Sequence, residues 1–346
     1  MPRAHASSPQ GLRVPAEWEP HAGTWMAWPH NPETWPGCLD EAEEEFAELV
    51  WTLGESEPVH LLVQDPAHAR HVHERLSHPG KNARVELHTV ETDDAWIRDT
   101  GPTFALDREG QLLALHWEFN AWGGKYPPWD RDAAVGAEIG NLAGAKIVRP
   151  GLVVEGGALE IDGQGTLLAT ESTLVDPARN ALARDALEAR LGDLLGVSRI
   201  VWLPGALAGD DTDGHVDQLA RFVAPGRVVC AVEPDRSDPN HEPLAACLGR
   251  LRETDDAAGR RLEIVELPMP TPIEADGTRL PASYLNFYIS NSSVLVPIFG
   301  VPADWTVMER LGPLFPGRKV VGLQCRNLIR GLGAIHCLTQ QQPATA

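Results

Sequence analysis

The feature that most constrains the fold of this chain is a repeated order of elements: two strand-like runs, a helix-like run and a third strand-like run. In one copy, residues 157–161 and 166–170 flank a turn-rich linker, leucines follow at helical spacing from Leu187, and residues 199–203 form the third apolar run. Asp176-Pro177 predicts the start of the helix, because aspartate caps helices and proline suits the first helical position. We expect an α/β fold of repeated units.

The same order is predicted in four other places along the chain. A pattern that returns at intervals of roughly 50 to 70 residues is typical of a ring of repeated units. Cys337 would close this ring beside the N-terminal copy, and no linker or low-complexity tract divides the copies, so we expect one domain. The copies comprise residues 24–28, 39–53 and 59–63; 96–117, a weak helix after Asp132 and 146–148; 215–232, a helix over 244–251 and 262–267; and 284–298, 305–311 and 319–323.

Five chemically competent side chains occur at similar points of the five copies. They are two acids, a histidine, an amide and a thiol, and each begins or enters a strand-like run. In a ring of repeats, equivalent positions face a common axis, so we expect these side chains to converge. The residues are Asp99, Glu155, His215, Asn286 and Cys337.

Charge and cysteine content exclude several classes of function. The formal net charge of -20 opposes binding to nucleic acid or to anionic membranes, although acidity is also common on ordinary solubilising surfaces. The five cysteines are scattered without a C-x-x-C pair, which argues against a disulfide framework or a zinc site. Residues 1–10 lack an apolar signal core and no run is long enough to span a membrane, so we expect a cytoplasmic protein.

Each candidate residue also has a plain structural interpretation. A buried cysteine is usually a small core residue, a histidine among aspartates can lie on the surface, and the glycines after Glu155 can form an ordinary turn. Asn286 could equally be a satisfied core amide. We expect Cys337 and His336 to point to opposite faces of a strand, whereas His215 and Asp217 would share one face.

A guanidinium group suits this set of side chains. It is planar, permanently charged and rich in paired N–H donors, so two carboxylates can hold it and fix its central carbon. A thiolate can then attack this carbon, while a histidine moves protons to the departing ammonia and from the hydrolytic water. The expected product is a ureido group, formed without a metal or cofactor.

The motifs around these residues closely resemble the agmatine deiminase family, which also includes bacterial-type peptidylarginine deiminases. The resemblance covers residues 14–343, with 1–13 and 344–346 as flexible termini, and implies the pentein fold, a propeller of five ββαβ blades around a central active site. It also implies cofactor-free conversion of agmatine to N-carbamoylputrescine and ammonia, a step of polyamine synthesis, through a thiouronium on cysteine. The motifs are Pro15–His21, Trp96–Pro102, Asn120–Lys125, Glu155–Gly157, Asp211–Asp217, Tyr284–Tyr288 and Ile335–Gln341.

The resemblance assigns roles residue by residue. It implies that Cys337 is the nucleophile, that His215 is the general acid and base, and that Asp99 and Asp217 hold the guanidinium. Glu155 matches the acid that orients the histidine. Further substrate contacts are expected from Asn286, Trp28, Trp122 and Asp213.

The chain departs from the family pattern in the loop before Cys337. The family commonly has a run of glycines there, whereas this chain has Leu332 and Ala334. These side chains could reshape the loop beside the nucleophile, which puts substrate fit, more than chemistry, in question.

Other functions remain open on the sequence. A peptidylarginine deiminase would use the same residues, and an amidotransferase-type cysteine hydrolase would need a nucleophile elbow. A cation-binding protein without activity would not need Cys337, and a metal site at His68, His71, His73 and His78 has poor helical spacing. The expected ligand is a small cationic guanidine, with no nucleic-acid or membrane partner, and a homodimer is an open alternative to a monomer.

Overall fold

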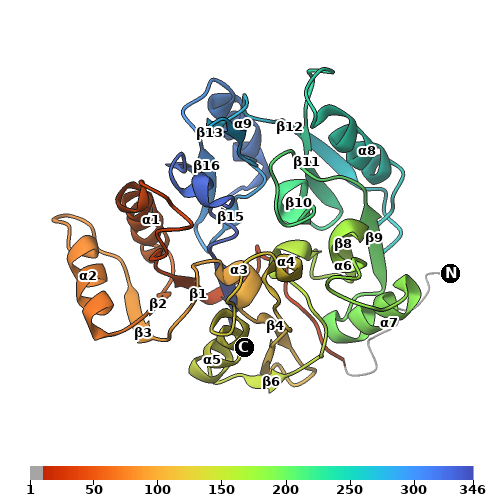
Figure 1. Ribbon diagram of the computed structural model, residues 1–346. Helices are drawn as coiled ribbons and strands as arrows, with labels where there is room; N and C mark the ends of the chain where they lie inside the picture. The colour runs from red at the N-terminus through yellow and green to blue at the C-terminus, as the bar shows by residue number, and fades with distance from the viewer. Residues whose placement is uncertain (1–10, 346) are drawn as a thin grey trace.

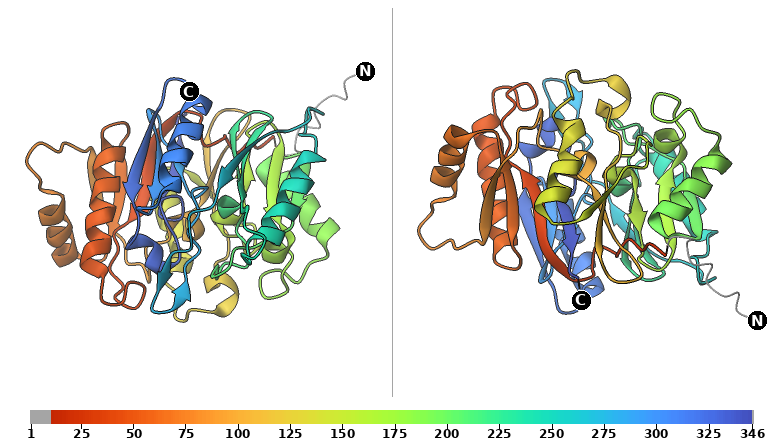
Figure 2. Two further views of the ribbon diagram at one scale, coloured as in Figure 1. Left: turned by 90° about the horizontal axis from the view of Figure 1, so that it is seen from above. Right: turned by 90° about the horizontal axis from the view of Figure 1, so that it is seen from below.

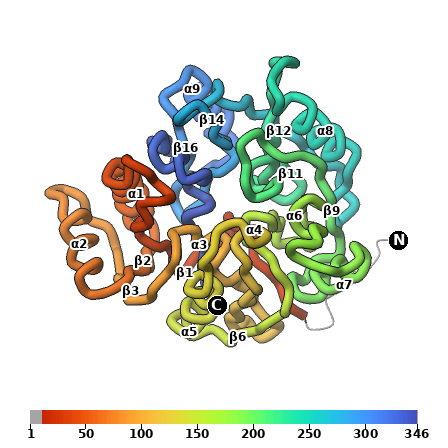
Figure 3. Tube along the Cα trace, in the orientation of Figure 1, coloured from red at the N-terminus to blue at the C-terminus, as the bar shows by residue number. Residues whose placement is uncertain are grey.

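The strands form separate small sheets. In the computed structural model, which describes residues 11–345, there are five sheets of three or four strands and one two-stranded sheet. No strand pairing joins one of these sheets to another in the described part of the chain. Figure 1 shows the units following one another around the middle of the molecule in the order of the chain, and the tube in Figure 3 traces the same succession.

Four units have the predicted order of elements. In each, an antiparallel strand pair is followed by helical structure and by a third strand parallel to the second. They comprise β4 (Thr103–Leu106), β5 (Leu112–Leu115), α4 (Ala121–Gly124), α5 (Asp132–Leu142) and β6 (Lys146–Val148); β7 (Glu160–Ile161), β8 (Thr166–Thr170), α6 (Glu171–Leu174), α7 (Arg184–Leu195) and β9 (Arg199–Leu203); β10 (Ala220–Ala224), β11 (Arg227–Val232), α8 (His241–Arg252) and β12 (Glu263–Pro268); and β15 (Tyr288–Ile289), β16 (Ser293–Ile298), α9 (Ala303–Leu311) and β17 (Lys319–Gln324).

The first sheet is completed by the C-terminal end of the chain. It contains β1 (His21–Ala27), β2 (Val59–Val63) and β3 (Val85–Thr89), with α1 (Leu39–Gly54) and α2 (Pro66–Leu76) between them. The last strand, β18 (Gln340–Pro343), pairs antiparallel with β1, so that the C-terminal strand lies in the sheet of the N-terminal unit, as the sequence predicts. Figure 2 shows the blue C-terminal strands beside the red strand of the N-terminal unit.

Short helical turns and one hairpin lie between these units. The hairpin is β13 (Glu274–Ala275) with β14 (Thr278–Arg279). The turns are α3 (Ile97–Thr100) before β4, η1 (Gly156–Ala158) before β7, η2 (Val216–Gln218) before β10, η3 (Gly312–Leu314) after α9 and η4 (Leu328–Gly331) after β17. Three of them, α3, η1 and η2, matter for function because they precede the first strand of a unit.

The helices pack by apolar stripes, as their sequence periodicity predicts. On α7, Leu187, Leu191 and Leu195 are spaced by four residues and are buried, and on α1 the buried stripe includes Phe46 and Leu53. The central strand β16 is buried along nearly all its length, which is the pattern of a strand covered on both faces. Burying these side chains is the main favourable term for each unit.

The predicted helix start at Asp176-Pro177 is wrong. The helix α7 begins at Arg184 instead, and residues 176–183 form an irregular segment. Asp176 does accept a hydrogen bond from the backbone N–H of Ala178, but it caps a tight turn and not a helix. Within this segment, the buried side chain of Arg179 pairs with Glu155 and Asp213.

Residues 1–10, part of the expected flexible terminus, and residue 346 lie outside the described residues. Leu12 is buried, and Arg13 forms a β-bridge with Leu106, so these two residues contact the body of the protein. Within residues 11–345, no helix combines the length and the apolar character that crossing a bilayer requires.

Candidate active site

The five predicted residues occupy equivalent places in the five units. Each lies on a turn shortly before the first strand of a sheet, and turns at one end of every unit can face the same centre. Asp99 lies in α3 before β4, Glu155 precedes η1 and β7, and His215 precedes η2 and β10; Asn286 lies before β15 and Cys337 before β18.

Two local predictions about these residues are wrong. Cys337 does not lie on a strand, because residues 335–338 form a turn that ends just before β18. His215 and Asp217 are likewise not on a strand but at η2, a single helical turn. The apolar alternation around these residues belongs to the strands that follow, and the turns are held by tertiary contacts that periodicity does not report.

Gly157 marks the point where the side chains converge. A Cβ atom at this position would lie 2.5 Å from His215 Nδ1, 3.0 Å from Asp99 Oδ1 and 3.1 Å from Asp217 Oδ2. Its backbone N–H also donates a hydrogen bond to Asp99 Oδ1 at 2.9 Å. Only a residue without a side chain allows three ionisable groups from two other units to approach this point so closely.

Asn286 holds the turn that carries Cys337. Its side-chain N–H donates to Cys337 Sγ at 3.2 Å and to Asp217 Oδ2 at 3.3 Å, while its Oδ1 accepts the backbone N–H groups of His336 and Cys337. Cys337 Sγ lies 3.9 Å from Asp217 Oδ2. The amide of Asn286 thus connects the thiol, a carboxylate and the backbone. An ordinary core amide would only satisfy its own hydrogen bonds.

His215 lies between two carboxylates. Its Nδ1 is 3.7 Å from Asp99 Oδ1, and its Nε2 is 3.9 Å from Glu155 Oε2. The second oxygen of Asp99 accepts a hydrogen bond from Trp122 Nε1 at 3.0 Å. Trp122 has a positive φ of 54°, and it follows Ala121 at 52°, so the backbone there adopts the left-handed region that favours glycine.

Buried polar atoms without a partner gather in this cluster. Among residues 11–345, nine buried side-chain nitrogen or oxygen atoms have no hydrogen-bond partner, and four of them belong to three neighbouring residues here. They are Glu155 Oε2, both ring nitrogens of His215 and Asp217 Oδ1. Buried polar groups in folded proteins are nearly always satisfied, so such a concentration indicates the place of a ligand, and N–H donors on it would satisfy the oxygens of Glu155 and Asp217.

The electrostatics of the cluster oppose a resting thiolate. Burial, with Asp217 and Asp99 nearby, raises the pKa of the Cys337 thiol well above its ordinary value. Burial alone would lower the pKa of His215, but Asp99, Glu155 and Asp217 outweigh it and raise the pKa to about 9. At neutral pH the cluster therefore contains a neutral thiol and an imidazolium.

The pKa values of Asp99 and Glu155 are shifted in opposite directions. Burial, with Asp217 and Glu155 nearby, raises the pKa of Asp99 despite the opposing effect of His215. For Glu155, burial is outweighed by His215 and Arg179, which lower its pKa. A bound cation between these groups would relieve the repulsion that raises the pKa of Asp99.

A buried ionic network supports Asp217 from behind. His336 Nδ1 is 2.6 Å from Asp217 Oδ2, and its Nε2 is 2.8 Å from Glu17 Oε2. Glu17 also pairs with Arg98 and Arg221, and these interactions outweigh its burial and lower its pKa. His336 Nδ1 and Cys337 Sγ both approach Asp217 Oδ2, and the sequence did not predict the link between His336 and Asp217. Glu17 lies in the motif Pro15–His21, so the sequence did contain a pattern that pointed to this residue.

A second network lies beside Glu155 and had no local signal in the sequence. Arg179 is fully buried, and it donates to Glu155 Oε1 at 2.7 Å, to Asp213 Oδ2 at 2.9 Å and to the carbonyl of Thr212. Lys125 also bonds Asp213 Oδ2, at 2.8 Å. Asp213, a predicted substrate contact, is therefore already paired with the side chains of Arg179 and Lys125. These contacts also connect the loop that carries Trp122 with the loop that carries His215.

One predicted substrate contact lies in the hydrophobic core. Trp28 is fully buried, its Nε1 donates to Glu43 on α1 at 2.5 Å, and its ring meets Phe46 edge-on. A tryptophan at the end of an apolar strand has the same local pattern in a core and in a binding site, so the sequence alone does not distinguish the two.

The loop before Cys337 keeps its crowded glycines. A Cβ atom at Gly331 or Gly333 would lie 2.9 Å or 2.5 Å from atoms of the Trp96 ring. Leu332 lies between them with φ of 71°, a conformation that favours glycine, and Ala334 is buried. Leu332 and Ala334 replace glycines of the family pattern, but the two positions packed against Trp96, Gly331 and Gly333, are still glycines.

The alternative metal site on α2 is not formed. Among the described residues, the only group of three or more potential ligands with close ligand atoms is His60, Glu86 and His88. His71 instead contacts Glu43 at 2.8 Å.

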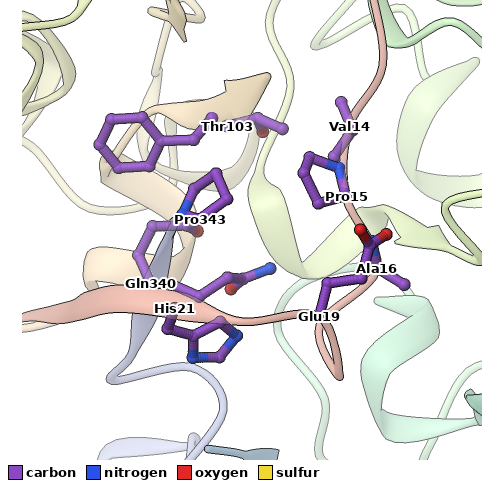
Figure 4. A pocket seen from close by; sticks show the side chains of 10 residues that line it. Val14, Pro15, Ala16, Glu19, His21, Thr103, Gln340 and Pro343 are labelled. Atoms are coloured by element: carbon purple, nitrogen blue, oxygen red, sulfur yellow. The ribbon is translucent and has the colours of Figure 1, made fainter. Parts of the chain in front are cut away.

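A small surface pocket lies beside the first sheet, away from the thiol. Figure 4 shows His21, Gln340 and Pro343 facing Pro15 and Glu19 across it. A neighbouring pocket is lined by Arg98 and His336, among others, and so reaches the network behind Asp217. Neither pocket is lined by Cys337, His215 or Asp99.

Comparisons with known proteins agree with this arrangement. A family model described as Porphyromonas-type peptidyl-arginine deiminase matches residues 13–343, which is nearly the whole chain. The chain belongs to this family. Among curated proteins, it is 38% identical to the agmatine deiminase of Ectopseudomonas mendocina and 39% identical to that of Stutzerimonas stutzeri, with 96% of each chain covered in both cases.

Solved structures of family members share the fold. The agmatine deiminase of Enterococcus faecalis superimposes with a TM-score of 0.90, 33% identity and 99% of each chain covered. A substrate-bound form of the C. jejuni agmatine deiminase gives a TM-score of 0.88 at 27% identity, covering 96% of this chain and 97% of the other. A more distant amidinotransferase from Microseira wollei, 14% identical with a TM-score of 0.55, shares the fold alone. The α/β pentein fold is thus the fold of this chain.

Proposed function

We propose that this protein hydrolyses agmatine to N-carbamoylputrescine and ammonia. The observation that carries the proposal is the set of buried, partnerless polar atoms on Glu155, His215 and Asp217 around a thiol. Family relatives that are named agmatine deiminases support the choice of substrate. The product would enter polyamine synthesis.

In the proposed mechanism, the carboxylates of Asp99 and Asp217 hold the guanidinium by charge-assisted hydrogen bonds. The cation lowers the cost of ionising Cys337, since the same two carboxylates oppose the thiolate when the substrate is absent. The N–H of Asn286 already points at the sulfur and would stabilise the anion. Binding of the substrate and activation of the nucleophile are therefore coupled.

The chemical steps follow from this arrangement. As the cation binds, the thiol of Cys337 releases its proton to solvent, because His215 is already protonated. The thiolate attacks the guanidinium carbon, and the tetrahedral adduct expels ammonia after one nitrogen takes the proton of the His215 imidazolium. The remaining thiouronium is attacked by water, which gives a proton to the now neutral His215. Collapse of the second adduct breaks the C–S bond and releases the ureido product, and the departing thiolate takes the remaining hydroxyl proton and becomes a thiol again. Glu155 orients His215 and favours its charged form.

The cations around the cluster favour agmatine over arginine. An arginine substrate would bring an α-carboxylate, which is costly to bury without a cationic partner. Arg179 and Lys125 lie beside the cluster, but both already pair with Asp213. We expect roughly a hundredfold preference for agmatine in kcat/KM, equivalent to about 2.7 kcal/mol.

Ammonia release from agmatine, free arginine and an arginyl peptide, compared side by side, tests the proposal. Cys337→Ser should be inactive on all three while keeping the fold. Treatment with chelator should leave wild-type turnover unchanged. Preference for the arginyl peptide would move the assignment to peptidylarginine deimination, and activity retained by Cys337→Ser would contradict the covalent mechanism.

We also propose how the units are arranged and where in the cell the enzyme acts. The five units would form the five blades of a propeller, as one domain over residues 14–343, because each contributes one residue to the centre. The acidic surface suits a small cationic substrate in the cytoplasm, without nucleic acid, membrane or cofactor, and a homodimer remains open.

A further inference from the structure

Two histidines and a glutamate meet on the first sheet, in a cluster that the proposed reaction does not use. His60 lies on β2, and Glu86 and His88 lie on the neighbouring strand β3. His60 is in register with Glu86, and residues two apart on a strand share a face, so all three side chains lie on the same face of the sheet. In the described chain, β3 is the edge strand of this sheet.

The distances in this cluster fit a divalent metal ion. His60 Nδ1 lies 3.1 Å from His88 Nε2 and 3.5 Å from Glu86 Oε2, and the three ligand atoms all lie within 4.8 Å of one another. Zinc bonds to nitrogen and oxygen are about 2.0–2.2 Å long, so the ligands of a tetrahedral site are roughly 3.3 Å apart. The two short distances match such a site before any rearrangement.

The surroundings hold both imidazole rings in place. Trp25 stacks on His60 with ring centroids 4.4 Å apart and also contacts His88 at 5.2 Å, which restricts both rings.

We propose that His60, His88 and Glu86 bind one zinc ion, with water completing the coordination. Two histidines and a carboxylate form a common zinc-ligand set, and borderline imidazole ligands favour zinc over magnesium or calcium. The Glu86 side chain is 67% exposed and that of His60 is 20% exposed, so the ion can enter from solvent and keep a water ligand. The alternative is a single hydrogen bond between two neutral imidazoles.

The site would join the edge strand β3 to β2 at a point outside the candidate active site. Zinc bound to the native state alone raises the free energy of unfolding by mass action, so the site would stabilise the N-terminal unit. This zinc would take no part in the proposed deimination.

The test uses the full-length protein, stripped of metal by chelator and then titrated with Zn²⁺ and with Co²⁺. We expect one equivalent of each to bind and the melting temperature to rise with Zn²⁺. Tetrahedral Co²⁺ with nitrogen and oxygen ligands should give visible d–d bands without the near-ultraviolet thiolate band that binding to Cys337 would produce. Loss of an outer-sphere partner typically costs about 10–100-fold in metal affinity, so loss of a ligand in His88→Gln should cost at least as much.

Glu86→Gln provides a second, milder variant, and His73→Gln on the exposed face of α2 is the matched control. His73→Gln should bind zinc like the wild type. If His88→Gln has the metal-free melting temperature of the wild type and still binds one equivalent with unchanged affinity, the proposed site is wrong. A thiolate band with Co²⁺, or no stabilisation by Zn²⁺ in the wild type, would also overturn it.

Discussion

Gly157 is the residue whose replacement tests the geometry of the centre most directly. Its missing Cβ leaves room for His215 Nδ1, which would lie 2.5 Å from it. Gly157→Ala should therefore push apart His215, Asp99 and Asp217 and reduce kcat by about 100-fold, because small misplacements of reacting groups have such effects. Steady-state kinetics with agmatine measure the change.

Gly249, on α8, is the matched control for this substitution. It is exposed within the helix, and nothing lies within 4 Å of the Cβ that an alanine would add. Gly249→Ala should leave kcat unchanged and stabilise the protein by about 0.5–1 kcal/mol, as alanine does in helices. Equal kcat in Gly157→Ala and in the wild type would contradict the convergence at Gly157.

The charge of His215 predicts a pH dependence of both activity and stability. Its pKa in the folded protein is about 9, compared with 6.5 in the unfolded chain. The imidazolium stabilises the fold fully below pH 6.5, and this contribution is lost as the pH rises through 9. The stability difference between the wild type and His215→Asn should therefore shrink between pH 6.5 and 9, measured by urea unfolding.

The same ionisation should appear in the kinetics. The rate of ammonia release should fall above about pH 9, because the imidazolium is the proposed proton donor. His73→Gln should keep the wild-type profile. A wild-type profile that stays flat to pH 10 would show that the departing ammonia takes its proton from another group.

At the scale of elements, the segment 176–183 connects structure with function. It replaces the first turns of the predicted helix and inserts Arg179 between Glu155 and Asp213. Removing one partner of a buried ion pair leaves the other charge unpaired, which typically costs about 3–5 kcal/mol. Arg179→Met should lose about this much stability in urea unfolding.

Arg179→Lys separates the charge of Arg179 from its geometry. It should be more stable than Arg179→Met, because the cation is kept, but it cannot reproduce the paired hydrogen bonds of a guanidinium. Its kcat should remain below that of the wild type, because Glu155 is less well placed to orient His215. If Arg179→Met unfolds like the wild type, the segment does not depend on this ion pair.

At the scale of the whole molecule, the net charge of -20 should accelerate capture of the dication agmatine. Raising the ionic strength from about 0.01 M to 0.15 M shortens the screening length from about 30 Å to about 8 Å. We expect KM for agmatine to rise several-fold over this range with little change in kcat, because the buried contacts of the site are screened much less. A salt-independent KM would exclude long-range attraction.

The sequence determined the repeated order of strands and helices and the five positions that face the centre. Both depend on local patterns. Apolar periodicity marks the buried face of each strand and helix, and a polar residue at the start of a strand interrupts this periodicity. The sequence also predicted that the segment of Cys337 lies beside the N-terminal copy, and β18, which follows Cys337, does pair with β1. The patterns that support these predictions lie within single units.

Only the tertiary structure decided which groups support the five residues. Trp28 is a core residue, Cys337 lies on a turn, and the helix α7 begins at Arg184, all against local expectation. Arg179 reaches the site through an ion pair and His336 through a hydrogen bond, each with a residue distant in the sequence. The strength of these contacts depends on burial and on distances between units, and a one-dimensional pattern contains neither quantity.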